Sequence, residues 1–264
     1  TKKDIAGMTP QEQLDALHVS TKEFMKNQYQ TLNRSLVPQL AQNGLKLVRH
    51  YEDLTPKQAK YVDKYFEKDV YPVLTPMAVD SSRPFPLVRN KSLNIGALIY
   101  DKKKDVTDIA TVQVPSVLPR IVKLPSEEKD VTEIILLEEV IEKNLDKLFL
   151  SYDIVCAYPY RIMRNADFSI DEEETADLLK EIEKQLKQRQ WGEVIRLEVD
   201  EAMDKKLLKE LKNHLGVDDE VVYKINGPLD LTFLMKANGI EGFEHLKYPK
   251  YKPQPVPGMG DYSH

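Results

Sequence analysis

Arginines and clustered acids are the residues of this chain whose types and spacing could do chemistry. Arg161 and Arg164 flank Ile162 and Met163 in a stretch where apolar and polar residues alternate. Arginine keeps its proton at physiological pH, so a buried or cleft-facing guanidinium needs an anion beside it. That anion is either a phosphate or the carboxylate of another domain, or else an internal carboxylate such as the acids of 171–174. The residues alone leave both interpretations open.

A second polar set lies on and after a proline-rich segment. Residues 70–124 carry eight Lys or Arg against four Asp or Glu, so this part of the chain is basic. A loop of this kind either presents hydrogen-bond donors to a polyanion or is a solvated connector. The set comprises Arg83, Arg89, Asn90, Lys91 and Asn94. We therefore take as candidate polyanion or interdomain contacts Arg83, Arg89, Lys91, Arg161 and Arg164.

The motifs of a self-contained enzyme are missing from the sequence. No two of the five histidines have zinc-site spacing, and Cys156 has no cysteine partner. No phosphate-binding glycine loop and no GxSxG nucleophile elbow occurs. The acids at 138–139 and 172–174 are typical of an outer helix face and a helix start rather than of a general acid–base pair. We predict no catalytic, cofactor-binding or metal-binding residue in this chain.

Two helix starts share one capping pattern. Thr9 is followed by proline and, three residues on, by Glu12, which predicts a helix beginning at residue 10. Leucines and Phe24 recur at three-, four- or seven-residue steps up to residue 40, so one long amphipathic helix should end at Asn43 and Gly44, with Pro38 kinking its last turn. The same capping pattern at residues 55–58 predicts a second helix.

From residue 92 onward the pattern favours strands interspersed with helices. Alternating apolar residues predict strands at 92–100, 111–114, 154–162, 195–199 and 221–223, with a polar loop at 101–105. Helical spacing and caps predict helices at 137–148, from 169, at 205–214 and at 229–237. This mixture predicts an α+β (mixed α/β) fold in which a long N-terminal helix packs on a sheet-and-helix domain. Prolines and glycines from residue 249 predict an extended linker.

Composition narrows the class of protein. The chain has 264 residues, and no apolar run reaches the ~20 residues of a membrane helix. A single cysteine favours the reducing cytoplasm. Residues 125–219 carry 14 basic and 25 acidic side chains, and the aromatic residues are not interleaved with basic ones, so we expect no nucleic-acid partner. Because residue 1 is Thr rather than Met, we expect a piece of a longer protein.

Eight short stretches occur in a characteristic order along the chain. They are LTPMAVD (74–80), RPFP (83–86), NKSLN (90–94), VQVPSVLPR (112–120), ILLEEVI (135–141), RNADFSIDEEE (164–174), IRLEV (195–199) and GPLDL (227–231). Together they resemble the class-1 polyphosphate kinases, which synthesise long-chain polyphosphate. The resemblance covers nearly the whole chain, from Thr9 to the linker.

The resemblance implies a larger enzyme with a helical N-terminal domain, a head domain and two catalytic domains related to the phospholipase D fold. Such an enzyme reversibly moves the terminal phosphate of ATP onto polyphosphate through a phosphohistidine, with magnesium. On this basis residues 1–45 end the N-terminal domain, 46–248 form the head and 249–264 are the linker to a catalytic domain. No histidine here, His264 included, matches the phosphorylated motif, so no catalytic, ATP or magnesium residue is carried over.

Two functions follow from these observations. The first is the non-catalytic head portion of a polyphosphate kinase, which self-associates through the head and contacts its own catalytic domains. In that case ATP and magnesium belong to the full-length parent and no cofactor to this part. The alternative is a polyanion-binding module that uses the basic residues of 83–94 and 161–164 to hold polyphosphate. An independent enzyme is disfavoured because no catalytic constellation is present.

Overall fold

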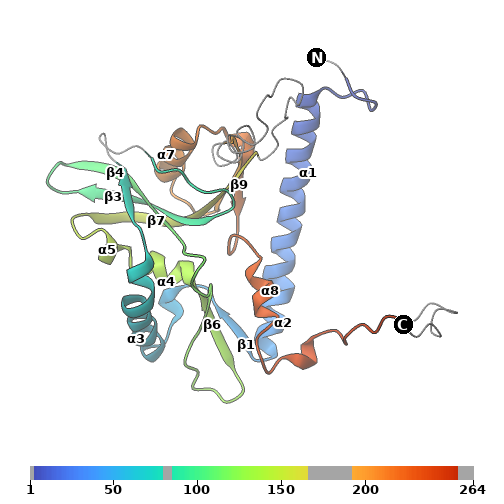
Figure 1. Ribbon diagram of the computed structural model, residues 1–264, viewed down its shortest axis with the longest axis vertical. Coiled ribbons are helices and arrows are strands. Elements are labelled where there is room, and N and C mark those ends of the chain that lie inside the picture. Colours follow the sequence, from blue (N-terminus) through green and yellow to red (C-terminus); the bar gives the residue numbers. More distant parts are fainter. Residues whose placement is uncertain (1–2, 80–84, 166–191, 255–264) are drawn as a thin grey trace, which may run out of the picture. The chain divides into compact units, whose positions relative to one another are not determined.

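Figure 1 shows the computed structural model, which describes residues 3–79, 85–165 and 192–254. The helix expected from residue 169 lies outside these ranges. The chain divides into two compact units, Thr1–Leu231 and Thr232–His264. This division differs from the expected boundaries at 45/46 and 248/249, which rest on the resemblance and stay a prediction.

The first unit opens with the expected long helix. α1 (Pro10–Thr31) begins at a complete capping box, in which the Thr9 hydroxyl accepts from the Glu12 amide and the Glu12 carboxylate accepts from the Thr9 amide. A π-helical turn, η1 (Leu32–Leu36), leads into α2 (Val37–Gln42). The wide turn lies directly before Pro38, which has no amide proton for an α-helical hydrogen bond. The helix ends at Asn43 and Gly44, as predicted.

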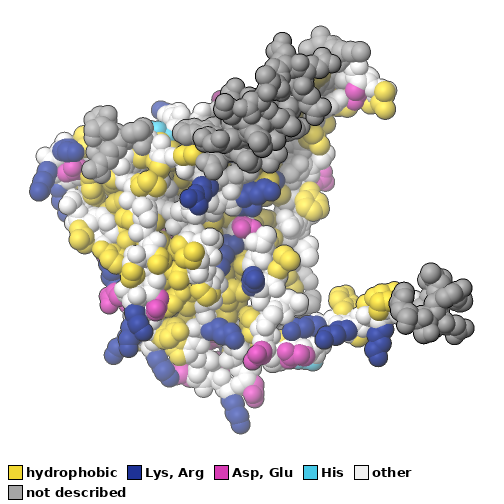
Figure 2. All heavy atoms as spheres, viewed as in Figure 1, with side chains coloured by type: hydrophobic (Ala, Val, Ile, Leu, Met, Phe, Trp, Pro, Cys, Tyr) yellow, Lys and Arg dark blue, Asp and Glu magenta, His cyan; other side chains and the backbone are white. Residues whose placement is uncertain are grey.

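The buried face of α1 is not the face that the leucine spacing predicts. Leu17 is 61% exposed and Phe24 is 67% exposed, and Figure 2 shows apolar side chains at intervals along this helix. Met25 and Tyr29 are buried instead, on the side that packs against strand β9 (Val222–Ile225), while Leu32 of the predicted stripe is buried just after α1. The prediction of one apolar stripe facing the core is therefore wrong for the first half of the helix, because an aromatic and a methionine form the contact.

A six-stranded sheet forms the centre of this unit. Its order is β2 (Met77–Val79), β4 (Val106–Gln113), β3 (Leu93–Asp101), β7 (Asp153–Arg164), β8 (Val194–Asp200) and β9. All neighbours are antiparallel except β8 and β9, which are parallel. The strands expected from alternation are confirmed, with ends that shift by a few residues. β3 is central and buried on both faces, as its apolar residues at successive positions require.

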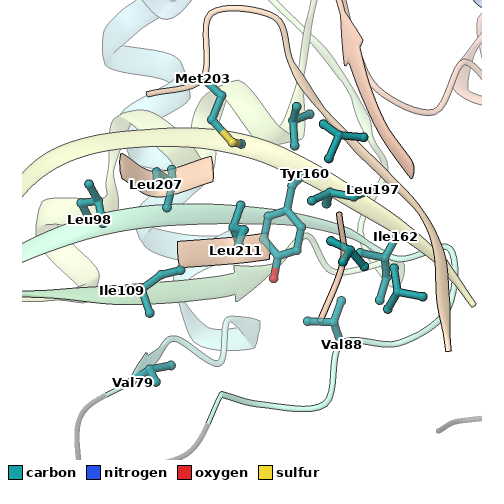
Figure 3. Packing of buried hydrophobic residues seen from close by; sticks show 14 residues of the cluster. Val79, Val88, Leu98, Ile109, Tyr160, Ile162, Leu197, Met203, Leu207 and Leu211 are labelled. Carbon is teal, nitrogen blue, oxygen red and sulfur yellow. The ribbon is translucent and has the colours of Figure 1, made fainter. Parts of the chain in front are cut away.

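One face of the sheet packs on α7 (Lys205–Leu215). Leu207 and Leu211 of this helix point toward the strands, where Tyr160 and Leu197 complete the cluster (Figure 3). The Tyr160 hydroxyl lies 2.8 Å from the Thr111 hydroxyl, so its polar end is satisfied inside the core. α7 begins at Asp204, whose carboxylate caps two amides, and ends at the left-handed Gly216. This helix confirms the one predicted for 205–214.

A three-stranded sheet and short helices complete the first unit. The sheet has the order β1 (Leu45–Val48), β6 (Thr132–Leu136), β5 (Ile121–Lys123), with β1 and β6 parallel. α3 (Pro56–Tyr65) starts at the predicted capping box, and its Gln58 also donates to the Glu133 carboxylate. The predicted helix of 137–148 is broken at Asn144 into α4 (Leu137–Lys143) and α5 (Leu145–Leu148). The remaining turns are π-helical at Phe66–Val70 and 3₁₀ at Tyr51–Asp53, Tyr71–Val73 and Asp219–Val221.

The second unit holds α8 (Phe233–Ala237) and a 3₁₀ turn at Glu244–Leu246. The helix predicted for 229–237 is therefore too long at its start. Asp230 has a φ of 55°, a left-handed conformation that an α-helix does not accept, so the helix begins after this residue. Among the described residues, no helix has the length and apolar character needed to span a membrane.

Candidate functional site

The anionic partners that Arg161 requires are carboxylates of the protein itself. Its guanidinium Nη1 lies 3.3 Å from Glu198 Oε2 on the neighbouring strand, and Nη2 lies 3.9 Å from Asp230 Oδ1. Nε donates to the Lys91 carbonyl at 3.2 Å. The side chain is only 14% exposed. The requirement for an anion is thus met by carboxylates far along the chain. The acids of 171–174 lie outside the described residues.

The other candidate residues take different places. Arg164 donates through Nε to the Val88 carbonyl and through Nη1 to the Gly192 carbonyl, at 3.1 and 2.8 Å. It therefore fastens the end of β7 to two adjacent segments. Arg89 and Lys91 are exposed on the turn before β3, where Lys91 has a φ of 61°. Arg83 lies outside the described residues.

Glu198 is the centre of a buried charge network. Its carboxylate accepts from Arg161 on one side and from Arg196, at 2.7 Å, on the other, while its own side chain is 5% exposed. Arg120 forms a two-pronged pair with Glu138, whose side chain is also 5% exposed. Desolvated carboxylates are stabilised only when charged partners surround them, and here each one has such a partner.

Asp230 joins the two halves of this network. Its carboxylate lies 3.9 Å from both Arg120 Nη1 and Arg161 Nη2. The Arg120 guanidinium also donates to the backbone carbonyls of Leu229 and Asp230, which fixes the turn. Strands β7 and β8, helix α4 and the turn at 227–231 are thereby tied together by charge. The carboxylates are held in ion pairs, so the network positions elements and offers no unpaired base for proton transfer.

A basic groove lies between α1 and the edge strand β9. Its volume is about 950 Å³. Lys22, Lys26 and Arg34 line it from the long helix, and Arg49 and Lys224 line it from the other side. Lys22 and Lys26 are one helical turn apart on one face of α1, and Arg34 of the π-helical turn η1 lines the same groove beyond them, so the three cations form a stripe along it. Sequence reasoning missed these residues, although the four-residue spacing of Lys22 and Lys26 was a readable signal.

The aromatic floor of the groove is already occupied by neighbouring groups. The Tyr223 ring lies between the Arg196 guanidinium, 4.4 Å from its centroid, and the Lys22 ammonium, 5.4 Å away. His18 Nδ1 lies 3.0 Å from the Tyr223 hydroxyl. Tyr29 donates its hydroxyl to the Pro228 carbonyl at 2.7 Å. These contacts fasten α1 to β9 and leave both rings buried.

Two acidic residues at the groove have partners of their own. Asp219 lies 2.6 Å from Lys212 Nζ, and that hydrogen bond is the main reason that its pKa is lowered. Glu201 accepts from the Asn226 side-chain amide. Five cations therefore face two engaged carboxylates, and the groove as a whole is positive.

The family models decide what kind of protein carries this site. A model described as the polyphosphate kinase middle domain matches residues 57–237, and one described as the polyphosphate kinase N-terminal domain matches residues 1–48. The chain belongs to the polyphosphate kinase family. The resemblance noted on eight short stretches is thereby confirmed.

Individual relatives carry the same name. A polyphosphate kinase from Lactiplantibacillus plantarum is 46% identical over 254 residues, which is 95% of this chain and 35% of the relative. One from Bacillus cereus is 43% identical over 263 residues, or 97% of this chain and 37% of the relative. The chain thus spans about a third of the length of the curated relatives it matches. A crystal structure of polyphosphate kinase from Porphyromonas gingivalis shares the fold, with a TM-score of 0.70 at 20% identity over 92% of this chain and 34% of that one.

In this chain of the polyphosphate kinase family, several of the diagnostic stretches meet in the buried network. Arg120 ends the stretch 112–120, Glu138 lies in 135–141, Glu198 in 195–199 and Asp230 in 227–231. Arg120 pairs with Glu138 and lies close to Asp230. Glu198 pairs with Arg196 of its own stretch and with Arg161, which lies outside the eight stretches and is also close to Asp230. Four of the eight stretches that carried the resemblance therefore contribute residues to a structural charge network, and the basic groove lies outside all eight.

A pH-dependent stability follows from helix α4 of this polyphosphate kinase chain. Burial, then repulsion from neighbouring carboxylates, raises the pKa of Glu142 to about 8, and the same causes raise that of Glu139 to about 8. The folded state therefore holds protons that the unfolded state releases above a pH of about 4.5. That contribution to stability is complete below the unfolded pKa and is lost as pH rises through 8. The surrounding charged groups are Glu52, Glu138, Asp200 and Arg49, and His50 Nδ1 lies 3.6 Å from Glu139 Oε2.

Glu142→Gln should remove its share of this dependence, because the amide is neutral at every pH, while Glu139 keeps its own share. We expect the melting temperature at pH 8 to rise by about 2–4 °C, which corresponds to roughly 1 kcal/mol in a chain of this size. At pH 4.5 the gain should vanish. Thermal unfolding followed by circular dichroism at pH 4.5, 6 and 8 measures both, with Glu127→Gln in an exposed loop as the control. An equal gain at all three pH values would contradict the titration.

Proposed function

We propose that this chain is the non-catalytic head and dimerisation portion of an ATP–polyphosphate phosphotransferase. The whole enzyme would move the terminal phosphoryl group of ATP onto the end of polyphosphate, releasing ADP, and would run the reaction in both directions through a phosphohistidine. The cytoplasmic location expected from the single cysteine remains part of this proposal.

The non-catalytic role is supported mainly by one observation, which is that the buried carboxylates are paired with arginines. Glu138 and Glu198 are each held by an arginine, and Asp230 lies close to two. Magnesium prefers carboxylate oxygens that are open to the ion and its waters. In the described part of the chain, no group of three or more His, Cys, Asp or Glu side chains could hold a metal ion. The pairing of these carboxylates with arginines supports a structural rather than a catalytic role for them.

Two measurements on the purified chain test this proposal. Incubation with γ-labelled ATP, magnesium and polyphosphate should label no protein and release no ADP, because covalent phosphoryl transfer needs an activated nucleophile. Light scattering over a wide dilution range should give twice the 30.5 kDa mass of one chain. Labelled protein would overturn the non-catalytic role. A monomer at every concentration would overturn the dimerisation role.

The alternative, a polyanion-binding module built on 83–94 and 161–164, is only weakly supported by the contacts. Arg161 pairs with a carboxylate inside the protein, and Arg164 donates hydrogen bonds to two backbone carbonyls. Of the remaining candidates, Arg89 and Lys91 are exposed. A polyanion role for this set stays a prediction, because the two arginines of 161–164 hold neighbouring segments of the fold together.

A further inference from the structure

We propose that the basic groove between α1 and β9 binds a linear phosphate polymer. The ligand would lie along α1, with its phosphates facing Lys22, Lys26, Arg34, Arg49 and Lys224. The inference extends the proposed function, because it places a site for the polymer on this chain. Binding here requires neither turnover nor dimerisation, so it can fail or succeed independently of them.

The arrangement of the cations favours a chain of phosphates over a single ion. Lys22 and Arg34 are twelve residues apart on the helix, which corresponds to a separation of roughly 18 Å along its axis. Lys26 lies between them in sequence and lines the same groove. A lone phosphate would meet one or two of these side chains, whereas an extended polyanion meets the full stripe and the cations opposite.

The groove cations are available for such a ligand. Among the described residues, none of the five forms an ion pair with a carboxylate; Arg49 donates to the Asn33 side-chain oxygen. Lys22, Lys26, Arg34 and Lys224 are exposed. The two acids at the groove, Asp219 and Glu201, are engaged elsewhere. A polyanion would therefore displace counterions from the groove without first breaking ion pairs within the protein.

The aromatic residues argue against a nucleic acid. Single strands bind proteins by stacking bases on accessible aromatic faces. Tyr223 and Tyr29 are 5% and 7% exposed, and cations already cover the Tyr223 ring. The groove offers charge and hydrogen-bond donors but no stacking surface. A phosphate polymer that carries no bases fits these features better.

The test compares two triple variants of the full chain. Lys22→Ala, Lys26→Ala and Arg34→Ala together remove the stripe. Lys57→Ala, Lys60→Ala and Lys64→Ala together remove three exposed cations with helical spacing from α3, and so match the charge change. Binding of fluorescently tagged long-chain polyphosphate is measured by anisotropy from low to moderate salt. Inorganic phosphate and oligo-dT of equal total charge serve as competitors.

We expect the groove variant to bind polyphosphate at least tenfold more weakly and the α3 variant to change affinity less than twofold. The slope of log affinity against log salt should fall by roughly 2 for the groove variant, since three phosphate contacts are lost. Arg34→Gln alone should show about a third of that change, and it keeps the helix intact should the triple variant misfold. Equal losses in both triple variants, no binding at low salt, or equal competition by oligo-dT would overturn the proposal.

Discussion

Glu198→Ala should lower the free energy of unfolding by about 3–5 kcal/mol, because removing one member of a buried ion network leaves its partners charged and unpaired. Arg161 and Arg196 both lose their main carboxylate in this variant. In a chain of this size, the melting temperature should fall by roughly 6–20 °C. Thermal and urea unfolding followed by circular dichroism measure the change.

The matched control is Glu128→Ala, which removes a carboxylate from an exposed pair. Glu128 lies 3.1 Å from Lys46, but its side chain is 65% exposed. Pairs of this kind are worth at most about 1 kcal/mol, since water screens them. If the two variants lose similar stability, the network around Glu198 contributes no more than a surface ion pair. A complementary variant, Glu198→Gln, should lie between them, because its single carbonyl oxygen still accepts a hydrogen bond from one arginine while its NH2 group cannot accept from the other.

Gly227→Ala should lower the free energy of unfolding by about 3 kcal/mol and loosen α1 in particular. Gly227 has a φ of 142°, and a Cβ built there would lie 3.1 Å from the Tyr29 ring. Strained backbone conformations of this kind cost about 1–3 kcal/mol for a residue with a side chain. The displaced ring adds to that cost, because Tyr29 is buried and its hydroxyl donates a hydrogen bond to the carbonyl of Pro228, the residue after Gly227. Hydrogen exchange at Met25 and Tyr29 should become faster.

Gly216→Ala is the control for backbone strain without crowding. Gly216 has a φ of 65°, and nothing lies within 4 Å of an added Cβ. The left-handed conformation alone costs about 1–2 kcal/mol for an alanine. We therefore expect a smaller loss and no change in the exchange of α1 amides. Equal exchange rates in the two variants would mean that the Gly227 turn does not hold the helix.

Elements with strong local signals could be predicted from the sequence. The two capping boxes, the alternation in β3 and the glycine that ends α7 each follow from residues close together in the chain. β1, β5 and β6 could not be predicted in the same way. They have three to five residues each, too few for a period-two pattern, and they pair across the chain.

The site was less predictable than the fold because it depends on distant partners. Alternation correctly placed Arg161 opposite in direction to Tyr160, so the need for an anion could be inferred. Nothing local indicated that Glu198 would be that anion, since the residues lie 37 positions apart on neighbouring strands. The groove was missed for a related reason. Lys22 and Lys26 look like an ordinary solvated helix face until Lys224 is brought opposite to them.

The contacts between α1 and β9 also set the order in which the protein can fold during synthesis. His18 and Tyr223 lie 205 positions apart, and Tyr29 and Pro228 lie 199 apart. At about 5–20 residues per second, the helix emerges from the ribosome roughly 10–40 s before the strand that covers it. An isolated helix of this kind is marginally stable in water. The nascent chain therefore passes through a long interval in which Met25, Tyr29 and Leu32 are uncovered, and the groove is the last part of the first unit to close.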